Sequence, residues 1–181
     1  METPNEQISY TKNWLNDVVI ELNLCPFAKY EVDRGAVRYQ VEVKKDKKEM
    51  LSSVIDECRM LDSKPEIETT LIIYGEQFSS FDTYLDFADL ANELLLAQGY
   101  EGIYQIATFH PEYCFEGEPK DDASNYTNRS PYPMLHLIRE DSLEATLNKF
   151  PNAESIPYRN IELTREMGAE KMHALLKACR R

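Results

Sequence analysis

The sequence predicts an α+β fold, a two-layer α/β sandwich built around a ferredoxin-like β-α-β-β-α-β core. Segments with the apolar patterns of strands alternate along the chain with segments of helical periodicity. The stretch from Thr69 to about Ile161 follows the strand and helix order of that core. A doubly wound parallel sheet is the competing fold. It is disfavoured because the chain has no glycine-rich phosphate-binding turn of the GxGxxG or GxxxxGK[ST] type.

An N-terminal helix and a strand–helix unit are expected before the core. Residues 1–9 are expected to be frayed, and a helix is predicted from Thr11 to Asn23, where Pro26 prevents its continuation. Apolar and polar residues alternate from Ala36 to Val43, which predicts a half-buried strand. The helix that follows carries an apolar stripe of Met50, Leu51, Val54, Ile55, Cys58 and Leu61.

The core itself begins with Thr69–Tyr74, which lacks polar alternation and therefore predicts a central strand that is covered on both faces. A long polar loop joins the next two strands. The remaining segments are a helix at 80–98, strands at 103–109 and 134–139, a helix at 141–150, a short extended segment at 155–161 and a last helix ending near Cys179.

Composition and charge exclude several classes of function. A chain of 181 residues most simply forms a single domain over 1–181. Its net charge of -12 disfavours nucleic acid and anionic membranes as partners. The stretch from Met1 to Lys12 is polar and lacks a signal sequence, and no apolar run is long enough for a membrane span. The cysteines form no CxxC pair, so reduced thiols and a cytoplasmic location are expected.

The loop Pro111–Pro131 and its flanking strands concentrate the residues that are capable of chemistry. His110 ends a strand, and its pKa near neutrality suits a general acid or base; the alternative is that it caps the strand. His136 lies between apolar neighbours and is more consistent with a core histidine. Cys25 is a candidate nucleophile beside His110 if the fold brings them together.

An anion pocket is the second hypothesis about this region. Arg129, Arg139 and Arg159 are unusual in an acidic chain, and a guanidinium binds carboxylate or phosphate through a planar fork. Asn125, Asn128 and Asn160 would orient such a ligand through amide donors. The alternative is that the arginines pair with acidic residues of the chain itself.

We expect neither a metal nor a cofactor. Adjacent carboxylates at Asp121 and Asp122 suit Mg²⁺, but on an exposed loop they are more often solvated. Zinc would require two cysteines and two histidines whose spacing here matches no usual zinc pattern; these are Cys25, His110, Cys114 and His136.

Several short blocks of sequence together resemble a bacterial group, the domain-of-unknown-function family 1415. These blocks are Leu24–Ala28, Ala107–Pro111, Asn125–Pro133, Leu135–Leu137, Ile156–Pro157 and Arg159–Asn160. The resemblance covers nearly the whole chain. It implies a small bacterial cytosolic protein and supplies no mechanism.

The function expected from the residues is therefore a cytosolic small-molecule enzyme or binding protein with a pocket for an anionic metabolite. The alternative is a structural or regulatory interaction module, in which the polar loop is an internally satisfied plug. A plug would bond its own backbone and show no concavity, whereas a site would show a pocket lined by His110 and the arginines. Whether the chain is an enzyme, and its oligomeric state, do not follow from the sequence.

Overall fold

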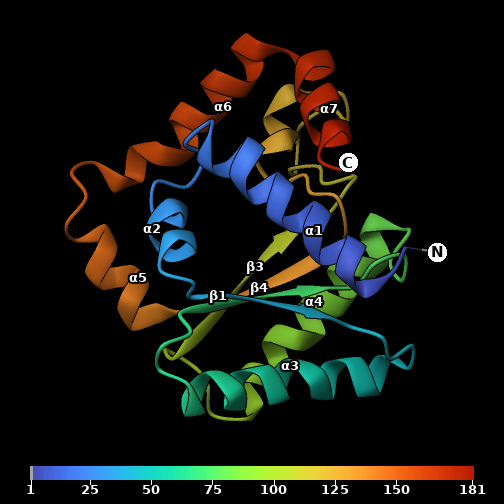
Figure 1. Ribbon diagram of the computed structural model, residues 1–181, viewed down its shortest axis with the longest axis vertical. Coiled ribbons are helices and arrows are strands. Elements are labelled where there is room, and N and C mark those ends of the chain that lie inside the picture. Colours follow the sequence, from blue (N-terminus) through green and yellow to red (C-terminus); the bar gives the residue numbers. More distant parts are fainter. Residues whose placement is uncertain (1) are drawn as a thin grey trace.

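A mixed four-stranded sheet of order β1-β2-β4-β3 lies at the centre of the computed structural model, which describes residues 2–181 (Figure 1). Its strands are β1 (Val37–Val41), β2 (Thr69–Ile73), β3 (Tyr104–Phe109) and β4 (Met134–Arg139). Strand β1 runs parallel to β2, and β4 runs antiparallel to both β2 and β3. The predicted α+β class is confirmed.

The prediction of a last strand at 155–161, which would complete a ferredoxin-like core, is wrong. Most of the segment 155–161 belongs to helix α6 (Ile156–Met167). Pro157 lies in the first turn of this helix, where a missing backbone N–H costs nothing because that group has no partner within the helix. The sheet position beside β2 is filled instead by β1, from the N-terminal half of the chain.

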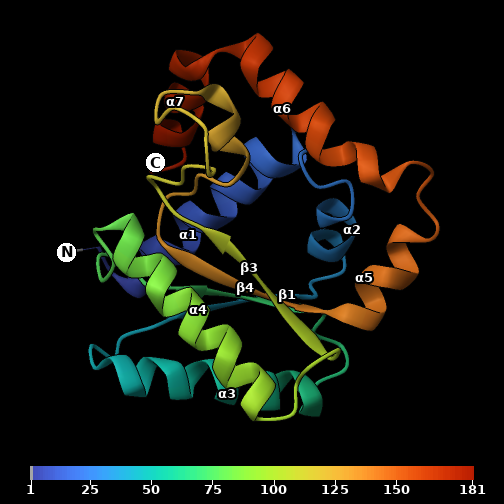
Figure 2. The ribbon, with the colours of Figure 1, turned by 180° about the vertical axis from the view of Figure 1, so that it is seen from behind.

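Helices cover both faces of the sheet, which adds a layer to the predicted two-layer sandwich (Figures 1 and 2). Helices α3 (Lys47–Ser63) and α4 (Phe81–Ala97) cover one face. Helix α1 (Pro4–Trp14) and the π-helical turn η1 (Leu15–Ile20) cover the other. All of β2 is buried, and alternate residues enter the two cores, which confirms the predicted central strand.

The N-terminal segment is helical from Pro4 onward, so the prediction that residues 1–9 are frayed is wrong for the described part of it; Met1 lies outside the described residues. Thr3 and Glu6 form a reciprocal capping box at the start of α1. The hydroxyl of Tyr132 also donates a hydrogen bond to the carboxylate of Glu2. One local contact and one long-range contact therefore hold the first turn in place.

The remaining elements extend the fold beyond the sheet. Helices α6 and α7 pack against one another and against η2, a 3-10 turn inside the long loop. Helix α2 was not predicted from the sequence. The bounds are α2 (Ala28–Asp33), η2 (Ala123–Thr127), α5 (Glu140–Leu147), η3 (Ala153–Ser155) and α7 (Ala169–Ala178). No described helix is long and apolar enough to cross a lipid bilayer.

Arg139, at the end of β4, forms hydrogen bonds with the backbone at the C-terminal end of α3. Its guanidinium donates to the carbonyl oxygens of Leu61 at 2.6 Å and Ile67 at 3.1 Å. It also donates to the hydroxyl of Tyr104 at 3.2 Å, which in turn donates to Asp62 at 2.7 Å. Leu61 lies in the last turn of α3 and Ile67 in the segment that follows it, so this one side chain joins the end of the helix to the start of β2.

We expect the substitution Arg139→Met to lower the free energy of unfolding by about 2–3 kcal/mol, because it removes the charge-assisted hydrogen bonds to the carbonyls of Leu61 and Ile67. Urea denaturation followed by circular dichroism measures the change. Arg59→Met is the matched control, since Arg59 makes only an exposed ion pair with Asp56. Equal effects of the two substitutions would contradict the structural role of Arg139.

His136 is partly buried in β4, where Nε2 lies 2.6 Å from the hydroxyl of Thr69. That hydroxyl donates to the carbonyl of Leu137, so it accepts from the imidazole N–H. Burial lowers the pKa of His136 to about 4. The neutral core histidine expected from the sequence is consistent with these contacts.

The lowered pKa of His136 makes stability depend on pH in one direction. The unfolded chain binds a proton near pH 6.5 and the folded chain only near pH 4, so stability is lost as the pH falls through this window. We expect His136→Gln to reduce the loss of unfolding free energy between pH 7 and pH 5 by about 2 kcal/mol. His173→Gln, on the exposed side of α7, is the control. An unchanged pH profile in His136→Gln would refute the assignment.

Candidate functional site

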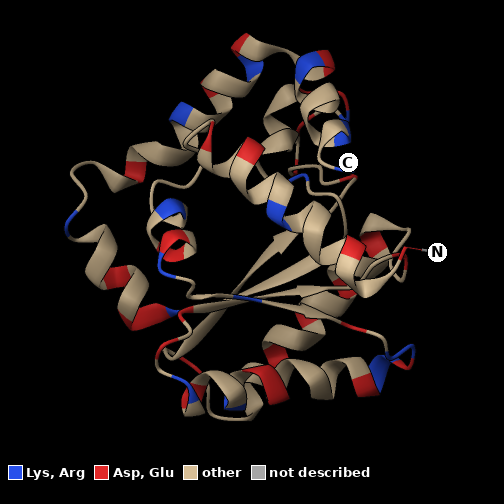
Figure 3. Cartoon of the chain, in the orientation of Figure 1, with Lys and Arg blue, Asp and Glu red and all other residues tan. Residues whose placement is uncertain are grey.

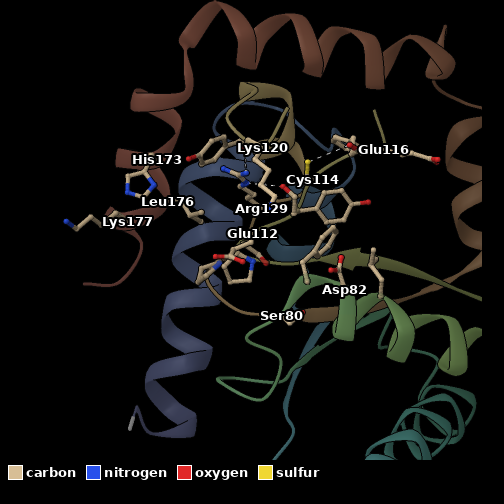
Figure 4. A pocket seen from close by; sticks show the side chains of 18 of the residues that line it. Ser80, Asp82, Glu112, Cys114, Glu116, Lys120, Arg129, His173, Leu176 and Lys177 are labelled. Atoms are coloured by element: carbon tan, nitrogen blue, oxygen red, sulfur yellow. Dashed lines mark hydrogen bonds between the residues drawn. The ribbon is translucent and has the colours of Figure 1, made fainter. Parts of the chain in front are cut away.

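An open cleft of about 1500 Å³ lies between the start of α4, the long loop and α7 (Figure 4). The loop contributes residues from Pro111 to Pro131, and α7 contributes His173, Leu176 and Lys177. The start of α4 is set by Ser80, whose hydroxyl accepts from the backbone N–H of Thr83. Three segments far apart in the sequence therefore meet at one end of the sheet.

The long loop forms a wall whose asparagine side chains bond the loop's own backbone and the adjoining strand, whereas the buried hydroxyl of Ser124 has no hydrogen-bond partner among residues 2–181. The side chain of Asn125, which is fully buried, accepts from the N–H of Phe115 and donates to the carbonyl of Pro119, both at 2.9 Å. Asn128 donates to the carbonyl of Thr108 at 3.2 Å. The two asparagines predicted to bind a ligand thus hold the loop itself, and neither lines the cleft.

Arg129 is the predicted site residue that does line the cleft. Its guanidinium donates to the carbonyls of Tyr113 at 3.0 Å and Lys120 at 2.6 Å, and it lies 4.5 Å from the ring centre of Tyr126. Its own carbonyl accepts from the indole N–H of Trp14 at 3.0 Å. These contacts fix Arg129 in place and connect the cleft wall to helix α1.

Cations line the cleft in an otherwise acidic chain. Besides Arg129, the lining contains Lys120, Lys177 and Arg180, together with His173. Arg180 pairs with the carboxylate of Glu2, whereas the structure of residues 2–181 gives Lys120 and Lys177 no ion pair. Two flexible ammonium groups are therefore available to a ligand.

Carboxylates occupy a different part of the lining. Asp82 and Glu116 lie on the side of the cleft opposite His173 and Lys177, and Glu112 lies between them (Figure 4). A row of aromatic rings runs along the same wall: Phe81 lies 5.1 Å from Tyr113, which lies 5.0 Å from Phe115. The cleft thus offers positive charge on one side, negative charge on the other and an apolar surface beside it.

His110 is 1% exposed and does not line the cleft. Its Nε2 lies 2.9 Å from the carbonyl of Phe78, and its Nδ1 accepts from the N–H of Glu112 at 3.0 Å. Burial lowers the pKa of His110, which favours the neutral imidazole with the proton on Nε2. Both ring nitrogens are used, as expected of a strand cap, so we assign His110 no acid–base role.

The remaining predicted residues lie away from the cleft. Asn160 donates to the carbonyl of Leu24 at 2.7 Å, and Arg159 donates to that of Asn23, so the two side chains hold the turn before Cys25. Burial raises the pKa of the Cys25 thiol, which opposes the thiolate form that a nucleophile needs. No hydrogen bond in the described chain joins Cys25 to His110.

The predicted convergence of Arg129, Arg139 and Arg159 is therefore wrong. Each guanidinium donates to backbone carbonyls, at the cleft wall, the end of α3 and the turn before Cys25 respectively. Backbone carbonyls at the ends of loops and helices need hydrogen-bond donors, and so does an anionic ligand. The sequence alone does not show which of the two an arginine serves. Three lining residues were missed, namely Lys120, His173 and Lys177. No local pattern shows that α7 folds back onto the loop, or that the loop residue Lys120 faces the cleft formed there.

The comparison with known proteins places the chain in a family. No curated protein and no solved structure matches it. The model of a family described as "Protein of unknown function (DUF1415)" matches residues 6–174, which include the loop, η2 and most of α7. The chain belongs to the DUF1415 family.

Proposed function

We propose that the cleft between α4, the long loop and α7 binds a small organic anion, a carboxylate or a phosphate, that carries an apolar or aromatic body. The observation that carries the proposal is the pair of lysines, Lys120 and Lys177, without ion pairs in a concave site of a chain whose net charge is -12. Elsewhere, the carboxylates Glu118 and Asp122 are paired with Arg165 rather than with these lysines.

The cleft also suits the body of such a ligand. Phe81, Tyr113 and Phe115 present ring surfaces that would bury an apolar or aromatic group. The carboxylates of Asp82 and Glu116 lie across from the cationic side and would accept hydrogen bonds from hydroxyl or amino groups at the other end of the ligand. The arrangement favours an elongated ligand with an acid group at one end and donors at the other.

The wall that receives the ligand is rigid before binding. Asn125 and Arg129 are held by the loop's own carbonyls, so ordering the loop on binding costs little entropy. We propose binding and assign no catalytic step. A cytoplasmic location is part of the proposal and is supported by the four free cysteines.

A protein-interaction module is the second candidate, and one observation favours it. The asparagines of the loop bond the loop's own backbone, as expected of an internally satisfied plug. The concavity beside the loop favours the small-molecule proposal over this one, because a plug that fills its own space leaves no cleft.

Thermal-shift screening of aliphatic and aromatic carboxylates and phosphate esters, followed by calorimetry, tests the proposal. We expect ligands to raise the melting temperature, and the double variant Lys120→Gln/Lys177→Gln to weaken their binding about tenfold or more, since each charge-assisted bond contributes about 1 kcal/mol. The matched control is Lys149→Gln/Lys171→Gln. It changes the net charge equally, and neither residue lines the cleft.

The emission of Trp14, the single tryptophan, gives a second readout, because its indole bonds the carbonyl of Arg129 beneath the cleft. Equal loss of affinity in the two double variants would show that net charge alone attracts the anion. Failure of every acid in the screen to stabilise the protein would overturn the proposal and favour the interaction module.

A further inference from the structure

Strand β1 is an open edge of the sheet. It pairs with β2 on one side only, at the opposite edge from β3. In Figure 1 β1 lies on the near side of the sheet, and in Figure 2, seen from behind, β3 lies on the near side. An edge strand carries a row of backbone N–H and C=O groups that can pair with another extended chain.

Backbone groups of successive residues in β1 alternate between the side facing β2 and the outer side of the sheet. The N–H of Glu42 donates to the carbonyl of Ile73 in β2, so even-numbered residues direct their backbone groups toward β2. Val37, Tyr39 and Val41 therefore direct theirs outward. The free edge spans the length of a short peptide strand, about five residues.

A groove of about 340 Å³ follows this edge. Helix α1 contributes Ile8 and Lys12 to one wall, and helix α3 contributes Met60 and the adjoining Lys64 to the other. Ile67 completes the apolar part of the lining. Apolar surface on both walls distinguishes the groove from a strand edge that only carries charged side chains to prevent pairing with other chains.

The charges in the groove are all positive. Lys12 lies 5.2 Å from the ring centre of Tyr39, and neither Lys12 nor Lys64 has an ion pair among those of residues 2–181. Arg38 is neutralised by Glu57 at 2.8 Å. Asp and Glu lie on most helices of the fold (Figure 3), whereas the groove lining contains none.

We propose that the β1 edge binds an extended acidic segment of a partner protein, which adds to the sheet as a further strand. The outward backbone groups of Val37, Tyr39 and Val41 would supply the ladder, and the Val41 carbonyl would exchange the side-chain amide of Gln40, which donates to it at 3.4 Å, for a donor of the added strand. Lys12 and Lys64 would supply the charge complementarity. This surface is separate from the cleft, and the inference does not depend on the ligand proposed there.

The position of the lysines specifies the pattern of acidic residues. Successive side chains of an added strand point to opposite faces of the sheet. One face carries α1 with Lys12, and the other carries α3 with Lys64. Two neighbouring acidic residues would therefore reach one lysine each, and apolar residues beside them would contact Ile8 and Met60.

A second copy of the chain is a poorer occupant than an acidic segment. Pairing of two β1 edges would bring Lys12 and Lys64 of each copy together, and like charges at close range repel. Size-exclusion chromatography at increasing protein concentration measures this directly. A dimer dissociated by Tyr39→Pro, which removes an outward N–H, would overturn the proposal in favour of self-association.

Peptide binding, followed by fluorescence anisotropy, tests the proposal itself. The probe is a labelled heptapeptide of valine and threonine, blocked at both ends, with two adjacent glutamates at its centre. Matched probes carry two lysines in place of the glutamates, or N-methyl groups on alternate backbone nitrogens. We expect the glutamate peptide alone to bind, and Lys12→Glu or Lys64→Glu to weaken it about tenfold each.

The N-methylated probe separates strand addition from simple charge attraction, because it keeps both glutamates and loses the backbone donors. Equal binding of this probe would overturn the proposal. So would absence of binding by the glutamate peptide at millimolar concentration to a protein whose circular dichroism is native. Lys171→Glu, outside the groove, is the control variant and should bind as the wild type does.

Discussion

The burial of β2 on both faces is the constraint on which the rest of the structure depends. Ile72 enters one core and Ile73 the other, so helices must cover each side of the sheet. α3 and α4 cover one side, and α1 with η1 covers the other. With both faces occupied, the long loop between β3 and β4 has to lie at the end of the sheet, where it meets the start of α4 and the α6–α7 pair. The cleft is a consequence of that crowding at one end.

The second requirement at this end is to satisfy the polar groups of a partly buried loop. Asn125 and Arg129 together bond four loop backbone groups, those of Phe115, Pro119, Tyr113 and Lys120. Residue types that suggest ligand recognition are thus used to hold the protein's own backbone. What remains for a ligand are the side chains with no such task, the lysines and carboxylates at the rim of the cleft. Arg139 is likewise engaged by the protein's own backbone, because it donates to carbonyl oxygens at the end of α3.

Local pattern predicted most of the fold, because helices and strands are encoded by periodicity and end signals. The strand 134–139, the buried strand beginning at Thr69 and the helix after Ser80 all have the predicted positions. The failures occurred where tertiary contacts decide. The first turn of α1 is held by Tyr132, more than a hundred residues away in sequence, and the segment after Ser155 becomes helical where a strand was expected. The site was predicted least well, since only Arg129 of the proposed residues lines the cleft. Whether an arginine faces a ligand or a carbonyl depends on chain folding that no local pattern records.

The distribution of charge gives the two proposed surfaces a common physical basis. A net charge of -12 keeps copies of the chain apart and lowers the concentration of anions near most of its surface. Lysines without carboxylate partners occur in the cleft and in the β1 groove, two concave places where walls of low dielectric strengthen their field. The acidic surface repels anions in general, and the lysines attract them locally. An anion therefore binds only where its shape also fits the cleft or the groove. Discrimination by the cleft and the groove therefore comes as much from the acidic surface around them as from the lysines within them.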